Sequence, residues 1–576
     1  MSMGYAPYKF NRRAGGSFVR PTGLAGAPPF GYGTSCVHAQ ARPGLRRRRE
    51  RKELSMSRRG MRRIGAALVL LLGAAAGAAT APAPPELRQR VRGFRTAHDR
   101  QIVQELADLV SLRNVAASRA DVQRNAEAIL ALLKRHGIEG RLLTAGDAPP
   151  AVFAEVRAPG ARRTVVFYAH YDGQPAAAAD WGGEDPWKPV LRTGPRGPET
   201  KDVDLATAPS PLPAEWRLYA RSASDDKAPI VAVLAALDAL RAAGVPPSVN
   251  VKLFFEGEEE AGSPHLKDIL TAHADLLKSD LWLLADGPVH QSRKLQVVFG
   301  ARGYTDVEMT VYGPLRALHS GHYGNWAPNP AALLAQLLAG LRAADGEIRI
   351  ADFYRDVRPL SDSEKRAAAA MPPVEESLRR ELGLAWNEGE DNGRLQDLIM
   401  RPALNLRGLK SGQVGKEARN AIPTDATASI DFRLVPDQTP AKVRELTEAH
   451  LRRQGYWVVS AEPDLATRLA HPRIVRLTWG DGYPGARTAM DLPASRAVLQ
   501  AIDAGWGEPV LRVPMLGGSV PVYVFSETFQ VPVIALPIAN HDNNQHAAYE
   551  NLRLQNLWDG IELYGVLFAG LERAWR

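Results

Sequence analysis

The stretch Val249-Asn-Val-Lys-Leu-Phe-Phe-Glu256-Gly-Glu258-Glu259-Glu260-Ala-Gly-Ser263-Pro264 joins a strand pattern to a dense group of carboxylates. Residues 251–255 are rich in β-forming side chains, and four glutamates lie within residues 256–260. Ligands bind beyond the carboxyl ends of strands in α/β sheets. Because so many negative charges repel one another unless a cation compensates them, this corner suggests a cation site. A solvated acidic loop is the alternative, and it would be preferred if the glutamates stood alone.

Helical and strand-like segments alternate around this stretch. Helices are predicted at residues 87–112, 122–136, 230–243 and 265–277, and strands at 151–156, 163–169 and 281–285. The strand at 163–169 is apolar throughout, as expected for a parallel strand that is covered on both faces. This alternation predicts an α/β fold with a mostly parallel sheet and flanking helices. Residues 180–215 are rich in Pro, Gly and Asp, and are expected to form a long surface loop.

The pattern changes after Gly303 and changes back near Ser495. Strands with one solvent-exposed face are predicted at 304–312 and 426–435, and helices at 331–341 and 441–453. A helix at 495–506, strands at 523–526 and 533–536, and a helix from 552 then resemble the first part. We therefore expect a main domain in two parts, 85–302 and 489–576, with a smaller α+β domain, 303–488, inserted between them. Residues 352–400 are charged and fit neither pattern.

The N-terminal region predicts export. Residues 1–55 have little order in their pattern and are interpreted as a non-native or disordered prefix. Residues 56–81 have a basic start, an apolar run and small residues at the end, which is typical of a signal peptide. The apolar run is short of a membrane span, so a retained anchor is the second choice. We expect a periplasmic or secreted protein without a stable membrane anchor.

The positive net charge does not predict a nucleic-acid partner. The chain carries +9, but residues 1–63 hold 15 Lys and Arg against Glu50 and Glu53, a surplus of +13. The remainder is therefore −4, and it offers no general affinity for phosphates. Cys36, the single cysteine, also lies in the prefix. Any metal bound by the rest of the chain must therefore be held by histidine and carboxylate side chains.

Five acidic and imidazole clusters stand at predicted strand ends or before a helix. They are His170-Tyr-Asp172, Ser224-Asp225-Asp226-Lys227, Glu259-Glu260, Asp286-Gly-Pro and Gln545-His546-Ala-Ala-Tyr-Glu550. Two histidines with three or four carboxylates suit a pair of divalent cations, with Zn²⁺ first and Mn²⁺ or Co²⁺ as alternatives. One carboxylate must lie between the two cations. A further glutamate that is not a ligand is needed to transfer a proton.

The motifs carry a specific resemblance. His-Tyr-Asp-Gly-Gln-Pro, Ser-Asp-Asp-Lys, Glu-Gly-Glu-Glu-Glu-Ala-Gly-Ser, His-Ser-Gly and His-x-x-x-Glu occur here in family order. Over most of its length the chain resembles the two-metal exopeptidases related to carnosinase, bacterial dipeptidases, glutamate carboxypeptidase and aminoacylase, the twentieth metallopeptidase family. This resemblance implies that His170 and Asp286 bind one metal, that Asp225 bridges, and that Glu260 and His546 bind the second metal.

The resemblance implies further roles. Glu259 resembles the general base and acid, and Asp172 resembles the carboxylate that fixes the imidazole of a ligand histidine. The sequence Leu318-His319-Ser320-Gly321 matches the lid histidine, which helps to hold the oxyanion and reaches the partner's site in dimeric members. A homodimer through the inserted lid domain is therefore expected.

The expected substrate-binding residues are Asn420, Arg433, Gly518 and Ser519. Arg433 is the candidate for gripping the substrate carboxylate, and the Gly517-Gly518-Ser519 loop for meeting the carboxyl end of the substrate. An exposed strand residue and an ordinary turn are the respective alternatives.

Several neighbouring residues are competing candidates. Asp226 is interpreted as a helix N-terminal charge rather than a ligand. Glu256 and Glu258 are interpreted as structural or solvated. His541 is the alternative to His546, and His322 is the alternative to His319. The departures from the family motifs, such as Ala228 and Tyr549, remove no expected ligand.

The sequence thus predicts a two-metal hydrolase that cleaves an amide bond beside a free carboxylate, as a dipeptidase or carboxypeptidase acting on small peptides. The same site could instead remove the acyl group from N-acyl amino acids. A non-catalytic periplasmic binding protein is the remote alternative, because it would need neither the dense carboxylates nor a glutamate for proton transfer.

Overall fold

The computed structural model describes residues 82–389 and 393–575. The expected prefix, 1–55, and the expected signal peptide, 56–81, lie outside the described residues. Among the helices that are described, none combines the length and the apolar content needed to cross a bilayer.

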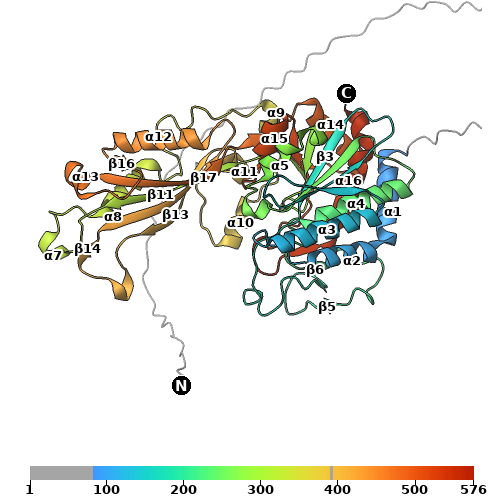
Figure 1. The fold of residues 1–576 in the computed structure, drawn as a ribbon, viewed down its shortest axis with the longest axis horizontal. Coiled ribbons are helices and arrows are strands. Elements are labelled where there is room, and N and C mark those ends of the chain that lie inside the picture. Colours follow the sequence, from blue (N-terminus) through green and yellow to red (C-terminus); the bar gives the residue numbers. More distant parts are fainter. Residues whose placement is uncertain (1–81, 390–392, 576) are drawn as a thin grey trace, which may run out of the picture. The chain divides into compact units, whose positions relative to one another are not determined.

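A mixed eight-stranded sheet organises the main domain (Figure 1). Its strands, in spatial order, are β1 (Gly140–Leu143), β2 (Ala151–Val156), β7 (Asn250–Glu256), β3 (Thr164–His170), β8 (Leu281–Leu284), β20 (Val533–Ala535), β9 (Gln296–Val298) and β19 (Leu511–Val513). The four central strands, β7, β3, β8 and β20, run parallel. β1 and β2 are antiparallel at one edge, and β9 is antiparallel to β20. The expected α/β fold is confirmed.

Helices cover both faces of this sheet. On one face lie α1 (Pro84–Ala97), α2 (Asp99–Val110), α3 (Arg119–Arg135), α4 (Lys227–Ala242), α14 (Pro493–Trp506) and α16 (Leu554–Ala574). On the other lie α5 (Leu266–Ala272), α6 (Ala274–Leu277) and α15 (Val522–Phe529). Strand β3 explains the two layers, because Phe167 packs into the first core and Tyr168 into the second. Both sides of the strand are buried, as its apolar sequence predicts.

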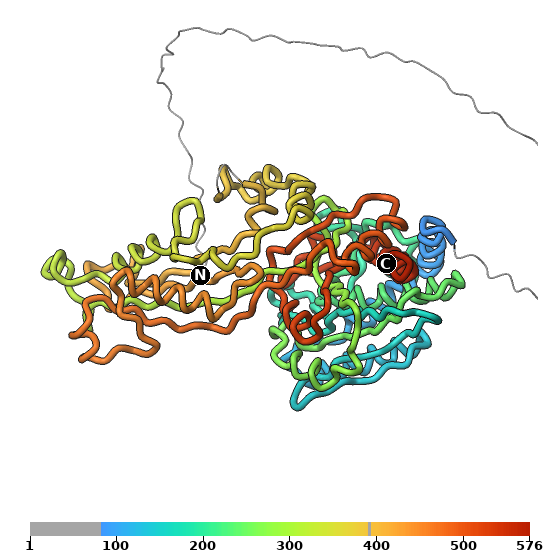
Figure 2. The backbone as a smooth tube through the Cα atoms, turned by 90° about the horizontal axis from the view of Figure 1, so that it is seen from above, coloured from blue at the N-terminus to red at the C-terminus, as the bar shows by residue number. Residues whose placement is uncertain are grey.

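The C-terminal segment completes the main domain. Strand β20 is inserted next to β8, and α16 packs against α1, α4 and α14. Figure 2 shows the red C-terminal segment among the blue and green ones, although the inserted region separates them in the sequence.

The inserted region has a sheet and a core of its own. The strand order is β13 (Ala403–Lys410), β15 (Asp425–Leu434), β11 (Gly303–Tyr312), β17 (Ile474–Tyr483) and β16 (Trp457–Val459). Helices α8 (Pro330–Leu341) and α12 (Pro440–Arg453) cover one face. The alternating burial of β11 places Val307, Met309 and Val311 against these helices. Two short strands of this region, β12 (Leu318–His319) and β14 (Ala421–Ile422), are far apart in the sequence and pair antiparallel; we call them the β12–β14 pair. The helix α7 (Ser320–Tyr323) follows β12, and α13 (Leu465–Ala470) also belongs to this region.

Two expectations were wrong. Residues 523–526 were predicted to be a strand, but they lie within the helix α15. A short apolar run does not distinguish a strand from a buried helix, and here Val522 and Phe525 fill the core beside β8. Residues 180–215 are not only a loop. They form β4 (Val190–Arg192) and β5 (Asp202–Val203), which continue an antiparallel sheet with β6 (Arg217–Tyr219) and β21 (Asn551–Arg553).

Residues 352–400 contain three short helices, α9 (Asp362–Ala369), α10 (Glu375–Leu382) and α11 (Leu395–Ile399). The guanidinium of Arg302 donates hydrogen bonds to the carbonyls of Leu398, Ile399 and Arg401 at the end of α11. This contact ties the charged segment to Arg302, where the first part of the main domain ends and the inserted domain begins.

Candidate functional site

Three neighbouring strands deliver acidic and imidazole groups to one edge of the sheet. His170 is the last residue of β3, and it is paired in register with Glu256, the last residue of β7. Glu259 and Glu260 follow β7 in a single 3₁₀ turn, and Asp286 comes two residues after β8. Because the three strands are parallel, their carboxyl ends meet at the same place.

Asp225 lies between the two histidines. Its Oδ1 is 3.0 Å from Nε2 of His170, and its Oδ2 is 3.1 Å from Nε2 of His546. The same nitrogen of His546 is 3.2 Å from Oε2 of Glu260. The ligand atoms of Asp225, Glu260 and His546 lie within 4.8 Å of one another. This is the arrangement in which one carboxylate could face two cations.

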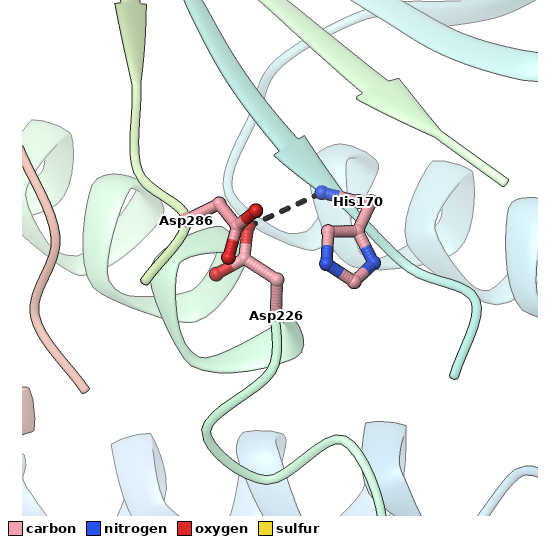
Figure 3. Close-up of side chains that lie close together, drawn as sticks. All are labelled: His170, Asp226 and Asp286. Atoms are coloured by element: carbon pink, nitrogen blue, oxygen red, sulfur yellow. Dashed lines mark hydrogen bonds between the residues drawn. The ribbon is translucent and has the colours of Figure 1, made fainter. Parts of the chain in front are cut away.

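Asp226 takes part in a second group with His170 and Asp286 (Figure 3). Asp226 stands at the N-terminus of α4, as predicted, but its side chain makes no capping hydrogen bond. Instead, Oδ2 accepts a hydrogen bond of 3.3 Å from the backbone N–H of His170. The other oxygen, Oδ1, is buried without a hydrogen-bond partner. The structure therefore places Asp226 in the cluster, where the sequence interpretation had left it out.

Asp172 fixes the geometry from behind the cluster. Its two oxygens accept hydrogen bonds of 3.0 and 2.9 Å from the backbone N–H groups of Glu259 and Glu260. Its Oδ1 also lies 3.4 Å from Nδ1 of His170. One buried carboxylate thus orients an imidazole and the turn that carries two glutamates.

The electrostatics of the cluster indicate a deficit of positive charge. Burial, followed by the nearby Asp225, raises the pKa of Asp286 to about 7. Burial also raises the pKa of Glu259 well above its usual value, and Asp286 and Glu260 add to this effect. For His546, hydrogen bonds to Asp225 and Glu260 raise the pKa to about 10. A divalent cation would relieve this crowding of carboxylates, and oxygen and imidazole donors are the ligands that zinc accepts. The residues present therefore fit a metal centre.

His546, rather than His541, meets the cluster. His541 is 4.0 Å from Asp542 and lines a different cavity. The backbone of His546 is left-handed, with φ of 59°. Such a conformation costs roughly 1–3 kcal/mol for a residue other than glycine, and it is found preferentially at functional sites. Hydrogen bonds within the loop hold this turn, including one from the backbone N–H of Gln545 to Asn543.

Glu550 and Gln174 support the site, although the sequence analysis gave them no role. The buried carboxylate of Glu550 accepts hydrogen bonds from the Arg221 guanidinium and from the backbone N–H groups of Ser222, Ser224 and Asp225. It therefore holds the loop that carries the central aspartate. The amide of Gln174 donates to Glu260 at 2.9 Å. Both residues stand in the quoted motifs, which was the available signal.

Glu256 and Glu258 have partners outside the cluster, as their structural interpretation requires. The hydroxyl of Tyr168 donates to Glu256 at 2.7 Å. Nδ1 of His265 lies 2.8 Å from Glu258.

A cavity of about 520 Å³ opens beside the cluster, and Gly518 and Ser519 contribute to its wall. The guanidinium of Arg433 donates a hydrogen bond of 2.9 Å to Oγ of Ser519. Three of the predicted substrate-binding residues therefore lie together at the margin of this cavity. Arg433 also pairs with Asp431 through Nε at 3.2 Å.

His319 and Asn420 lie together in a different place, at the β12–β14 pair. The carbonyl of Asn420 accepts a hydrogen bond from the backbone N–H of Ser320. Among the described residues, the side chain of His319 contacts the N–H of Gly321 and the ring of His322, and it is exposed. The structure does not bring these two residues to the cluster of their own chain.

Comparison with known proteins finds a family whose sequence pattern matches most of the chain. A model of peptidase family M20/M25/M40 matches residues 166–569. The Cys-Gly metallodipeptidase dug1 of Schizosaccharomyces pombe is 27% identical over 421 residues, which is 72% of this chain and 81% of the relative. The human Beta-Ala-His dipeptidase is 26% identical over 531 residues, which is 88% of this chain and 97% of the relative.

A solved structure has the same fold. An M20 family metallo-carboxypeptidase from Sulfolobus solfataricus matches with a TM-score of 0.65 at 25% identity, over 82% of this chain and 99% of that protein.

Proposed function

Because the chain belongs to peptidase family M20/M25/M40, we propose that it is a metal-dependent dipeptidase or carboxypeptidase that hydrolyses the amide bond beside a free carboxylate. The observation that carries this proposal is the position of Asp225, with one oxygen facing His170 and the other facing His546. Relatives that match most of the chain are named as dipeptidases, which favours small peptides as substrates.

Two Zn²⁺ ions are the proposed cofactors. His170 and Asp286 would hold one ion, Glu260 and His546 would hold the other, and Asp225 would serve both. Asp226 lies close enough to the first group to contribute. When bound, such a pair of cations polarises the substrate carbonyl and lowers the pKa of a water molecule.

Glu259 is the proposed proton carrier. One of its oxygens lies 3.9 Å from Nε2 of His170, so the carboxylate stands beside the cluster. The side chain is not a member of either ligand group. It can therefore accept a proton from the attacking water and deliver it to the leaving nitrogen. Arg433 and Ser519 would bind the carboxylate of the substrate.

Chelation and metal replacement test this function. We expect the purified protein to lose dipeptide hydrolysis in a chelator and to regain it when Zn²⁺ is added. Elemental analysis should find about two zinc ions per chain. A parallel panel of N-acetyl amino acids separates a peptidase from a deacylase. Hydrolysis that survives complete removal of metal would refute the proposal, and the absence of any hydrolysis with zinc would favour a binding protein.

The inserted domain is proposed to form a homodimer. His319 and Asn420 do not meet the cluster of their own chain, although His319 matches the lid histidine of the resembled family and Asn420 matches a substrate-binding position. The edge strand β13 exposes Leu406 and Leu409, which are 39% and 63% exposed. An exposed apolar edge strand is a surface that proteins usually cover. We place a second copy there, with the β12–β14 pair of one subunit reaching the cluster of the other.

Export to the periplasm or the medium is also proposed, from the pattern of residues 56–81. N-terminal sequencing of protein from fractionated cells tests it. A chain that keeps these residues and stays in the cytosolic fraction would overturn this part.

A further inference from the structure

The cavity beside the cluster has two unlike sides. On one side it is bounded by the charged residues of the site, Asp225, Glu259, Asp286 and His546. Its other walls are apolar, and they are formed by Leu284, Val298, Ala301, Leu516, Val520, Val522, Val533 and Ala535. A volume of about 520 Å³ is within the usual range for small-molecule sites.

The apolar wall is built by three neighbouring strands. Ala535 of β20 is in register with Leu284 of β8 on one side and with Val298 of β9 on the other. Val298 is backed by Met371 and Val513, which form a small core of their own. Met371 comes from the charged segment 352–400, so this segment closes the wall from behind. The surface is therefore supported by packing rather than by a free loop.

The wall has no partner for a charged side chain. Among the described residues that line the cavity, the charged groups are the four of the metal cluster, and Gln545 and Ser519 are polar. A Lys, Arg, Asp or Glu side chain that packs on the apolar wall would lose its hydration without gaining an ion pair there, because the charged groups of the cavity belong to the metal cluster on its other side. An aliphatic or aromatic side chain would gain from the same burial.

The position of Arg433 decides which residue of the substrate places its side chain in the cavity. Its guanidinium is bonded to Ser519, which itself lines the cavity. A terminal carboxylate at Arg433 and Ser519 therefore brings the side chain of the carboxyl-terminal residue to the apolar wall, while the scissile amide faces the cluster.

We propose that this cavity selects substrates whose carboxyl-terminal residue is aliphatic or aromatic. The inference rests on the proposed function, because it takes the cluster as the place of hydrolysis. It adds the class of substrate, namely dipeptides of the form Xaa-Leu or Xaa-Phe, and it makes Val298, Val520 and Val533 residues that determine specificity.

A substrate series on the zinc-loaded protein tests the preference. Ala-Leu, Ala-Phe, Ala-Gly, Ala-Asp and Ala-Lys share the amino-terminal residue and differ at the carboxyl-terminal side chain. We expect kcat/KM for Ala-Leu and Ala-Phe to exceed that for Ala-Gly by roughly 10- to 100-fold. Ala-Asp and Ala-Lys should be poorer than Ala-Leu by a similar factor or more. Equal values across the series, or a preference for a charged residue, would overturn the inference.

The variant Val520→Lys places a cation on the wall at a position that is only partly buried. The ratio of kcat/KM for Ala-Leu to that for Ala-Asp should fall at least about 10-fold. The lysine makes the wall less apolar, and its ammonium group can pair with the aspartate side chain of the substrate. Leu469→Lys, at a side chain 80% exposed on α13, is the matched control and should leave the ratio unchanged. Using a ratio removes any general loss of activity. An unchanged ratio in Val520→Lys would also overturn the inference.

N-acetyl-Leu and N-acetyl-Asp separate this inference from the proposed function. If only the N-acetyl compounds are cleaved, the peptidase assignment fails, and the preference for leucine over aspartate still tests the cavity. If dipeptides are cleaved without preference, only the cavity inference fails. If zinc-loaded protein cleaves neither class, both are refuted.

Discussion

At the scale of single residues, the site separates ligand groups from a group that stays available for proton transfer. Asp172 uses both oxygens to hold the backbone of Glu259 and Glu260. Glu260 is directed to His546 and Gln174, whereas Glu259 makes no hydrogen bond through its side chain in the described part of the chain. The two adjacent glutamates thus have different surroundings, which suits different tasks.

The substitution Glu259→Gln tests this separation. We expect kcat to fall by at least about 10³-fold, since the amide cannot accept the proton, while zinc content stays near that of the unmodified protein. Steady-state kinetics and elemental analysis measure the two quantities. Glu527→Gln, on the exposed surface of α15, is the control. Turnover close to that of the unmodified protein would remove Glu259 from the mechanism.

At the scale of elements, the loop that carries Asp225 is held by a residue more than three hundred positions away. Glu550 accepts five hydrogen bonds from residues 221–225, including the hydroxyl of Ser224. Lys227, at the start of α4, donates to the carbonyls of Leu109 and Leu112 at the end of α2. The central aspartate is therefore positioned by contacts among three separate segments.

Replacing Glu550 by Gln is expected to weaken zinc binding, although Glu550 is not a proposed ligand. The amide keeps one acceptor, so part of the backbone network is lost and Asp225 is less firmly placed. Outer-shell changes of this kind typically reduce metal affinity 10- to 100-fold. Competition with a chromogenic chelator measures the dissociation constant. An unaltered zinc affinity would show that the loop holds its position without Glu550.

The end of α3 carries a pH-dependent contact. His136 lies 2.6 Å from Asp238 of α4 through Nδ1, and 3.2 Å from Glu105 of α2 through Nε2. Burial disfavours the charged imidazole, but the hydrogen bonds to Asp238 and Glu105 outweigh it and raise the pKa of His136 to about 9. A pKa that is raised on folding stabilises the protein fully below the unfolded value near 6.5, and this contribution is lost as the pH rises through 9.

We therefore expect His136→Gln to lower the free energy of unfolding by on the order of 3 kcal/mol at pH 6, and by little at pH 9.5. Urea denaturation of the zinc-loaded protein at pH 6, 7.5 and 9.5 measures the difference. A loss that is equal at all three pH values would contradict an ionic contact and indicate a packing effect alone.

At the scale of the whole molecule, the predicted functional residues form two groups. The metal cluster, Arg433 and Ser519 meet at one cavity, whereas His319 and Asn420 lie at the β12–β14 pair of the inserted domain. A chain that acts alone would leave the second group unused. A homodimer in which the β12–β14 pair of each subunit reaches the cluster of the other would bring both groups to each site.

Mixing two inactive variants tests the exchange. Glu259→Ala lacks the proton carrier, and His319→Ala lacks the histidine of the β12–β14 pair, so each homodimer should be nearly inactive. After dissociation and reassociation, half of the dimers combine both variants, and each has one intact site. About a quarter of the unmodified activity should return, as symmetry requires. If no activity returns although mixed dimers form, His319 does not act across the interface.

The sequence by itself determined the parts whose physical signal is local. The apolar run of β3 required burial on both faces, and the alternation in β11 and β15 required one covered face. The clusters around His170, Asp225 and Glu259 carried their chemistry in adjacent residues. A short run such as 523–526 lacked this property, because Tyr523, Val524 and Phe525 are compatible with a strand and with a buried helix alike, and packing beside β8 selected the helix.

Only the tertiary structure decided how these parts combine. The order of β7, β3 and β8 brought their ends together, and it turned Asp226 toward Asp286 instead of the helix that it precedes. The apolar wall beside the cluster joins β8 and β9 to β20, which follows them only after the whole inserted region. Such contacts depend on strand order and on the balance of burial between distant segments, and no local pattern encodes either of these.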